Sequence, residues 1–288
     1  MTQPIVSVIM PVRNGAMVIG DQLEALANQD YLGPFEVIIA DNGSTDGTRD
    51  VAALYGHRLH RLVVIDASER PGANHARNLG AAAAAGEVYA FCDADDVVDG
   101  AWLDRLIAAL TYADLVGGAL SVERLNDDQV LRWRPVPPLD ELRTFDGFLP
   151  YAVGANLGIR ASVFHELGGF HPGYPTGDDV EIALRARLAG FEVAFAPDAL
   201  VHYRFRGTLR ELLHQSIGYG VIGPHLYHDY RDEVPPSRFR DAARAWARLA
   251  VNAPLALVRP ELRGTVVRGI GLRVGRIQAS LQNRVVYL

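Results

Sequence analysis

The chain has 288 residues, of which 49% are hydrophobic and 22% charged, so it can bury a substantial core and its composition excludes a disordered protein. No apolar run is long enough to span a bilayer, and a single cysteine, Cys92, excludes a disulfide-stabilised scaffold. The net charge is −6, but residues 238–288 carry ten arginines against two acidic residues, a local +8 that leaves −14 for the rest.

Strands and helices are predicted to alternate over the first 120 residues. Apolar, mostly β-branched segments predict strands at 5–10, 35–40, 62–65, 88–92 and 115–120. The first should end at Pro11, because proline cannot donate a hydrogen bond within a sheet. Helical patterns lie between these strands, at 18–28, 48–55, 74–85 and 101–110. This alternation is typical of βαβ units and a parallel sheet.

The regularity ends after residue 120. Residues 121–150 contain several prolines and predict an irregular excursion that would cover a site. Order should return at 154–160, followed by a glycine- and proline-rich loop, a helix and two short strands, at 171–177, 180–188, 192–195 and 200–203. Beyond Gly207 the pattern is helical, with breaks expected at Gly223-Pro224, Pro235-Pro236 and Pro260. We therefore expect one domain over 1–207 and a helical extension over 208–288.

The predicted strand at 88–92 runs directly into three carboxylates, Asp93, Asp95 and Asp96. Ligands of open α/β sheets bind beyond the carboxyl ends of the strands. Carboxylates this close repel one another, which raises the pKa of at least one unless a cation is present. Hard oxygen ligands suit Mg²⁺ or Mn²⁺, so we expect a divalent metal here. The alternative is a solvated acidic turn that caps the next helix.

Polar residues at the ends of other elements are further candidates. Asp41 ends the second predicted strand, where a carboxylate either accepts hydrogen bonds from a base or ribose or forms an Asx turn. Arg77 lies on the alanine-rich helix, where it would face a diphosphate or form a surface ion pair. His202, in a short apolar strand, is either a satisfied core residue or a nitrogen ligand of the metal.

Asp178 and Asp179 form a second acidic cluster, at the start of a predicted helix. The helix dipole alone favours carboxylates at that position. The glycine- and proline-rich loop before them, however, suits a segment that faces a substrate. One of the two carboxylates is therefore a candidate general base for a hydroxyl nucleophile.

These motifs follow one another in a recognisable order. They are Pro11-Val12-Arg13-Asn14, the segments 41–48 and 72–80, Asp93-Ala94-Asp95-Asp96, Gly177-Asp178-Asp179-Val180-Glu181, and His202. Together they closely resemble the family 2 glycosyltransferases, inverting enzymes with the A-type nucleotide-sugar transferase fold, over roughly residues 6–230. The resemblance implies an α/β protein with a Rossmann-like, mostly parallel central sheet flanked by helices, and a C-terminal helical extension.

The resemblance also implies roles for individual residues. The donor-binding residues would be Pro11, Val12, Asn14, Asp41, Arg77, Asp93, Ala94 and Asp95. Asp95 would bind Mn²⁺ or Mg²⁺, with His202 beside the metal. Asp179 would be the catalytic base, although Asp178 stands where the family usually has Glu, which leaves open which of the two does the chemistry.

The implied activity is metal-dependent, inverting transfer of a sugar from a nucleotide-sugar donor, expected to be UDP-linked, to a hydroxyl acceptor such as a lipid-linked saccharide. The product would be a cell-surface polysaccharide, a glycolipid or a glycosylated metabolite. A non-catalytic nucleotide-sugar-binding module is one alternative. A phosphatase of the haloacid dehalogenase type is another, although those enzymes use a lysine and this chain contains none. We expect no nucleic-acid partner and, from the lone cysteine, a cytoplasmic location.

The arginine-rich C-terminal segment predicts basic amphipathic helices. Within 239–258 an apolar face is expected from Ala243, Trp246, Ala247, Ala250 and Leu257. Such helices lie at a membrane interface, or they pack on protein. The sequence therefore predicts either peripheral contact with the inner face of the membrane or a homo-oligomer formed through these helices.

Overall fold

The computed structural model describes residues 5–287, and the chain divides into two compact units. The first unit contains the residues up to Leu125 together with Pro137–Arg204. The second contains Asn126–Val136 and the residues from Phe205 onward.

An eight-stranded sheet forms the centre of the first unit, in the order β3-β2-β1-β4-β9-β6-β10-β5. Its strands are β1 (Val6–Val12), β2 (Phe35–Asp41), β3 (Leu62–Asp66), β4 (Val88–Cys92), β5 (Val97–Val98), β6 (Leu115–Ser121), β9 (Asn156–Arg160) and β10 (Val193–His202). The predicted mostly parallel sheet is confirmed. However, β9 runs antiparallel between β4 and β6, and β5 antiparallel to β10.

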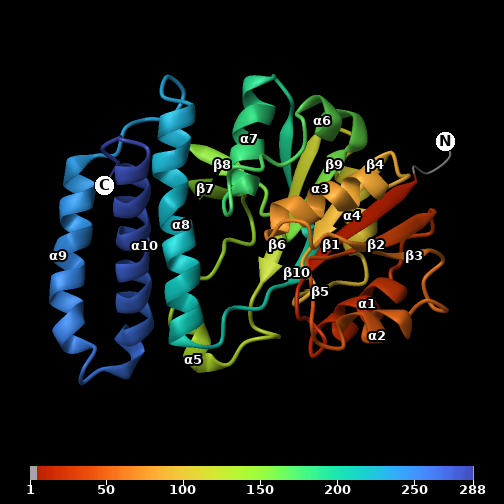
Figure 1. The fold of residues 1–288 in the computed structure, drawn as a ribbon, viewed down its shortest axis with the longest axis horizontal. Helices are drawn as coiled ribbons and strands as arrows, with labels where there is room; N and C mark the ends of the chain where they lie inside the picture. The colour runs from red at the N-terminus through yellow and green to blue at the C-terminus, as the bar shows by residue number, and fades with distance from the viewer. Residues whose placement is uncertain (1–4, 288) are drawn as a thin grey trace. The chain divides into compact units, whose positions relative to one another are not determined.

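Helices cover both faces of this sheet (Figure 1). One face packs against α1 (Ile19–Ala27), α2 (Thr48–Ala53) and α4 (Trp102–Ala109), and the other against α3 (Ala73–Ala83), α6 (Ala161–Glu166) and α7 (Asp178–Leu188). Val8 and Met10 belong to the first core and Ile9 to the second, as the alternation of a strand requires. Burial on both faces explains why β1, β2 and β4 read as continuous apolar runs.

Three predictions for residues 5–203 differ from the structure. β1 continues through Pro11 to Val12, because only β2 pairs with it there, and β4 pairs with it no further than Ile9. The two short strands expected after residue 191 form one strand, β10, whose register shifts between Ala196 and Leu200. The excursion at 121–150 contains a short helix, α5 (Asp128–Leu131), and a hairpin of β7 (Arg143–Phe145) and β8 (Leu149–Tyr151).

The second unit is built on α8 (Leu209–Asp229), α9 (Phe239–Leu255), the 3₁₀ turn η1 (Pro260–Leu262) and α10 (Arg263–Gln282). The predicted break at Gly223-Pro224 is wrong: α8 continues through Pro224 and packs along its length on α10, which offsets the lost backbone hydrogen bond. Thr208 and Glu211 begin α8 with a reciprocal capping box. Among residues 5–287, no helix combines the length and apolar character needed to cross a membrane.

Candidate active site

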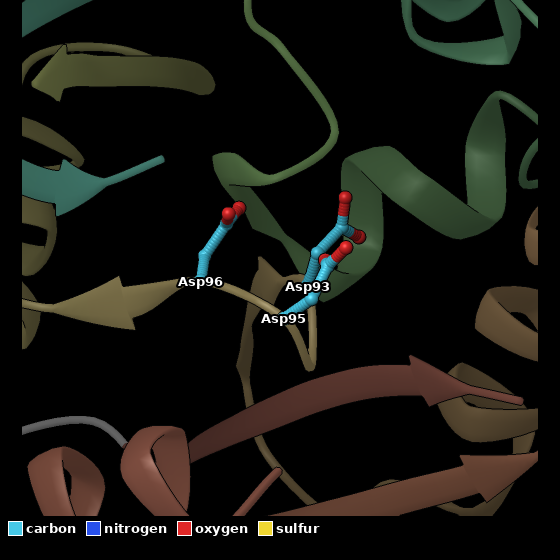
Figure 2. A group of neighbouring side chains, drawn as sticks. All are labelled: Asp93, Asp95 and Asp96. Carbon is cyan, nitrogen blue, oxygen red and sulfur yellow. The ribbon is translucent and has the colours of Figure 1, made fainter. Parts of the chain in front are cut away.

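An acidic turn follows β4 at the centre of the sheet. One carboxylate oxygen from each of Asp93, Asp95 and Asp96 lies within 4.8 Å of the other two. Figure 2 shows the carboxylates of Asp93 and Asp95 close together, with Asp96 beside the start of β5. Ala94, between them, is buried. Like charges this close disfavour one another's ionised form unless a positive charge compensates them.

Two residues that the sequence analysis did not single out hold the acidic turn. Gln22 of α1 is fully buried; it donates to the Asp93 carbonyl (3.0 Å) and accepts from the Val98 amide (2.9 Å). The Arg204 amide donates to the Asp96 carboxylate (2.7 Å), and its guanidinium donates to the Asp95 carbonyl (2.8 Å). The one sequence signal for Gln22 is a polar residue on the core-facing side of a predicted amphipathic helix.

Arg77 of α3 connects the acidic turn to α7. Its guanidinium donates to the carboxylates of Asp93 (2.7 Å) and Asp178 (3.1 Å) and lies over the Phe170 ring, 5.7 Å from its centre. The side chain is almost fully buried, and a Cβ added at Gly154 would approach the guanidinium to 3.1 Å. Both predicted acidic clusters are thus brought together by one buried arginine.

The same face of α3 positions the loop that leads to α7. The Asn74 amide donates to the Tyr174 carbonyl (2.8 Å), and Asn78 exchanges hydrogen bonds with the backbone of Phe170 (2.7 and 2.9 Å). Asn74 and Asn78 are four residues apart and lie on one side of the helix. The motif at 72–80 therefore supports the second acidic cluster through its asparagines.

Asp178 and Asp179 occupy the first turn of α7 in different surroundings. Asp178 is buried against Arg77, whereas Asp179 accepts hydrogen bonds from the amides of Gly154 (3.1 Å) and Val180 (2.9 Å). Burial raises the pKa of both carboxyl groups, and the ion pair with Arg77 opposes the rise at Asp178. Burial and the charge of Asp178 raise the pKa of Asp179 to about 6.

The predicted nucleoside-binding residues lie at the carboxyl ends of β1 and β2. Val12 and Asp41 are direct neighbours in the ladder, and Pro11 is paired with Ala40. Asp41 is fully buried; burial would raise its pKa, but hydrogen bonds from Ser44 and Arg49 lower it overall. Asn14 accepts a hydrogen bond from the Thr45 amide (2.8 Å) and so ties the two loops together.

His202 lies at the end of β10, opposite Val97 of β5. Among residues 5–287, the side chains gathered closely enough to share a metal ion are those of Asp93, Asp95 and Asp96, and the His202 imidazole is not one of them. Its Nδ1 is buried without a hydrogen-bond partner. Burial, together with the charge of Arg124, lowers the pKa of the imidazole, which favours the neutral form that a metal ligand requires. Its predicted role as a ligand stays a prediction.

The donor set of the acidic turn fits a divalent metal. It consists of carboxylate oxygens, the hard ligands that Mg²⁺ and Mn²⁺ prefer. Arg77 contacts one edge of Asp93 and leaves the cluster with a net negative charge. The residues present are therefore compatible with the predicted cofactor.

The chain matches the model of glycosyl transferase family 2 over residues 7–168, and that of glycosyl transferase family group 2 over residues 90–274. The first match covers more than half of the chain, so this protein belongs to glycosyl transferase family 2. A curated relative, the glycosyltransferase AglE of Haloferax volcanii, is 32% identical over 202 residues, which cover 69% of this chain and 66% of that protein. The chain thus spans just under two thirds of that relative, and 53% of a mycobacterial one.

Solved structures confirm the predicted A-type fold. The mannosyltransferase PcManGT of Pyrobaculum calidifontis, in complex with GDP-Man and Mn²⁺, has a TM-score of 0.68 at 22% identity, covering 98% of this chain and 88% of that one. S. aureus TarS 1-349, in complex with UDP-GlcNAc, has a TM-score of 0.57 at 18% identity, covering 100% and 93%. At these identities the likeness shows the fold alone.

Proposed function

We propose that this protein transfers a sugar from a nucleotide-sugar donor to a hydroxyl acceptor, with inversion at the anomeric carbon and with a divalent metal. The observation that supports this most directly is the network around Arg77. Through one guanidinium, Arg77 links Asp93, in the cluster suited to the metal and the donor, to Asp178, in the pair suited to proton abstraction. Family membership supports the same class of reaction.

Asp179 is the base in this proposal. Two backbone amides orient its carboxylate, and its raised pKa makes it a better proton acceptor than an ordinary aspartate. Asp179 would take the proton of the acceptor hydroxyl while the oxygen attacks the anomeric carbon. The nucleoside diphosphate would leave from the opposite face, so a single displacement gives inversion. Asp178, held by Arg77, would fix the start of α7.

The donor would lie along the carboxyl ends of β1, β2 and β4. We assign the nucleoside end to Pro11, Val12, Asn14 and Asp41, and the ribose and diphosphate end to Arg77, Asp93, Ala94 and Asp95. Asp95, with His202 as a further candidate, would hold Mn²⁺ or Mg²⁺. When bound, the cation supplies Lewis-acid neutralisation of the charge that develops on the leaving diphosphate.

A UDP-linked donor remains our expectation, although the solved neighbours carry both GDP-Man and UDP-GlcNAc. For the acceptor we propose a hydroxyl of a saccharide, lipid or metabolite, in the cytoplasm and at the inner face of the membrane when the acceptor is lipid-linked. A panel of UDP- and GDP-linked sugars, scored by release of the nucleoside diphosphate, identifies the donor.

Asp95→Ala tests the metal-assisted reaction. We expect diphosphate release in Mn²⁺ or Mg²⁺ to fall by at least about a hundredfold, because the leaving group loses its charge compensation. Asp140→Ala, at an exposed aspartate of the same unit, is the matched control and should retain activity. Full activity in excess chelator would contradict metal dependence. Donor binding without turnover on any acceptor would identify a non-catalytic binding module instead.

A further inference from the structure

The second unit has an exposed apolar face along α9 and α10. The buried or half-buried apolar residues of α9 are Ala242, Ala245 and Leu249, and Ala256, directly after the helix, is buried as well. The apolar face predicted from the sequence is not the packing face. Its members Trp246 and Leu257 are 48% and 79% exposed, and Phe239, at the same helical phase, is 77% exposed.

α10 contributes to the same surface. Ile270, Ile277 and Leu281 are exposed and lie on one side of this helix. The Arg273 guanidinium lies over the Trp246 ring of α9, 5.4 Å from its centre. Ile270 and Ile277 are the neighbours of Arg273 one turn before and one turn after it. We name the exposed apolar side chains Phe239, Trp246, Leu257, Ile270, Ile277 and Leu281 the α9–α10 face; the contact of Arg273 with Trp246 links its two helices.

The α9–α10 face belongs to an arginine-rich part of the chain. Residues 238–288 hold ten arginines, and the two acidic residues among them cannot neutralise so much charge. Asp241 is already paired with Arg244 (3.3 Å). Burial, with repulsion from Arg276, Arg248 and Arg268, lowers the pKa of Arg273, which shows how closely the positive charges are spaced. The face therefore favours an anionic partner.

The charge disfavours a second copy docked through the same face. A second copy docked face to face would bring another +8 against the first, and like charges repel. An anionic bilayer supplies phosphates for the arginines and an apolar boundary for the exposed side chains, and tryptophan is favoured at that depth. We propose that the α9–α10 face binds the surface of anionic phospholipid membranes. This inference does not depend on the proposed sugar transfer.

Flotation of the full chain with phospholipid vesicles tests the proposal. We expect the protein to float with vesicles that contain phosphatidylglycerol, to float far less with phosphatidylcholine alone, and to be released by salt. Leu257→Gln and Leu281→Gln should each lower partitioning roughly tenfold, because an exposed leucine loses its apolar burial in the bilayer. Arg240→Gln and Arg248→Gln should each lower it about fivefold.

Met17→Gln and Leu32→Gln are matched controls, since both residues are 94% exposed in the first unit, and they should leave flotation unchanged. Thermal melting confirms that each variant folds. Absence of flotation with anionic vesicles overturns the proposal, as does equal flotation of the leucine variants and the wild type. A lipid-free dimer that Leu257→Gln dissociates would assign the face to a second copy instead. Release of a nucleoside diphosphate, measured separately, reports on the proposed transferase alone.

Discussion

At the scale of single residues, Asp178 and Asp179 are neighbours with different expected roles. Asp179→Asn should lower turnover by roughly a hundredfold or more, the range expected of a general base, with donor binding nearly unchanged. Asp178→Asn should affect turnover less and stability more, because it leaves buried Arg77 with one carboxylate fewer. Steady-state kinetics with equilibrium donor binding measure both. A larger loss of turnover for Asp178→Asn would exchange the two roles.

The raised pKa of Asp179 gives this prediction a pH dependence. The base must be ionised, so turnover should rise as the pH passes through about 6. The folded protein favours the protonated form of Asp179, so the ionised carboxylate lowers the stability of the fold above about pH 6. Below pH 3.8, the ordinary pKa of an aspartate, the carboxyl group is protonated in both the folded and the unfolded chain, and this loss of stability disappears. Asp179→Asn should therefore raise the melting temperature at pH 8 but not at pH 4. An unchanged melting temperature at pH 8 would contradict the raised pKa.

At the scale of elements, small residues let α8 and α10 approach closely. A Cβ added at Gly275 would collide with the Ile217 carbonyl and lie 3.0 Å from the Gly220 Cα, both in α8. At Gly269, on the same helix, the nearest atom would be Leu249 Cδ1 at 3.4 Å. Only the first position therefore requires glycine for helix packing.

Gly275→Ala should lower the free energy of unfolding by about 1 to 3 kcal/mol, because the helices must move apart. Gly269→Ala should be neutral or should raise it by up to about 1 kcal/mol, since alanine is the better helix former. Urea unfolding of both variants measures the difference. Equal effects at the two positions would mean that the close crossing does not stabilise α10.

At the scale of the whole molecule, donor binding should stabilise the fold by mass action. A nucleoside diphosphate with Mn²⁺, at a hundred times its dissociation constant, should add about 2.7 kcal/mol. The melting temperature should therefore rise with UDP, or with GDP if the donor is GDP-linked, and chelation should reduce the shift. Thermal shift assays measure this, and Asp95→Ala should lose the metal-dependent part. A shift unaffected by either chelation or Asp95→Ala would contradict the metal site.

Local patterns in the sequence were sufficient for much of the first unit. β4 ends at Cys92, directly before the acidic turn, as predicted, because an apolar run buried on both faces and followed by charged residues has only one favourable boundary. The alternation of apolar strands with amphipathic helices likewise specified a mostly parallel sheet. The helix predicted at 18–28 forms α1, which buries Ile19, Leu23 and Leu26, residues spaced so that they share one face of the helix.

The tertiary structure alone decided which distant groups meet. Arg77 contacts carboxylates 16 and 101 positions away, and Arg204 reaches Asp96 across 108 positions, distances over which no local periodicity carries information. The antiparallel direction of β9 depends on its insertion between β4 and β6. α9 carries apolar residues on two adjacent sides, and its contact with α10 determines which side is buried. The spacing of hydrophobic residues specifies that a helix is amphipathic, but only the packing partner of the helix determines which face is buried.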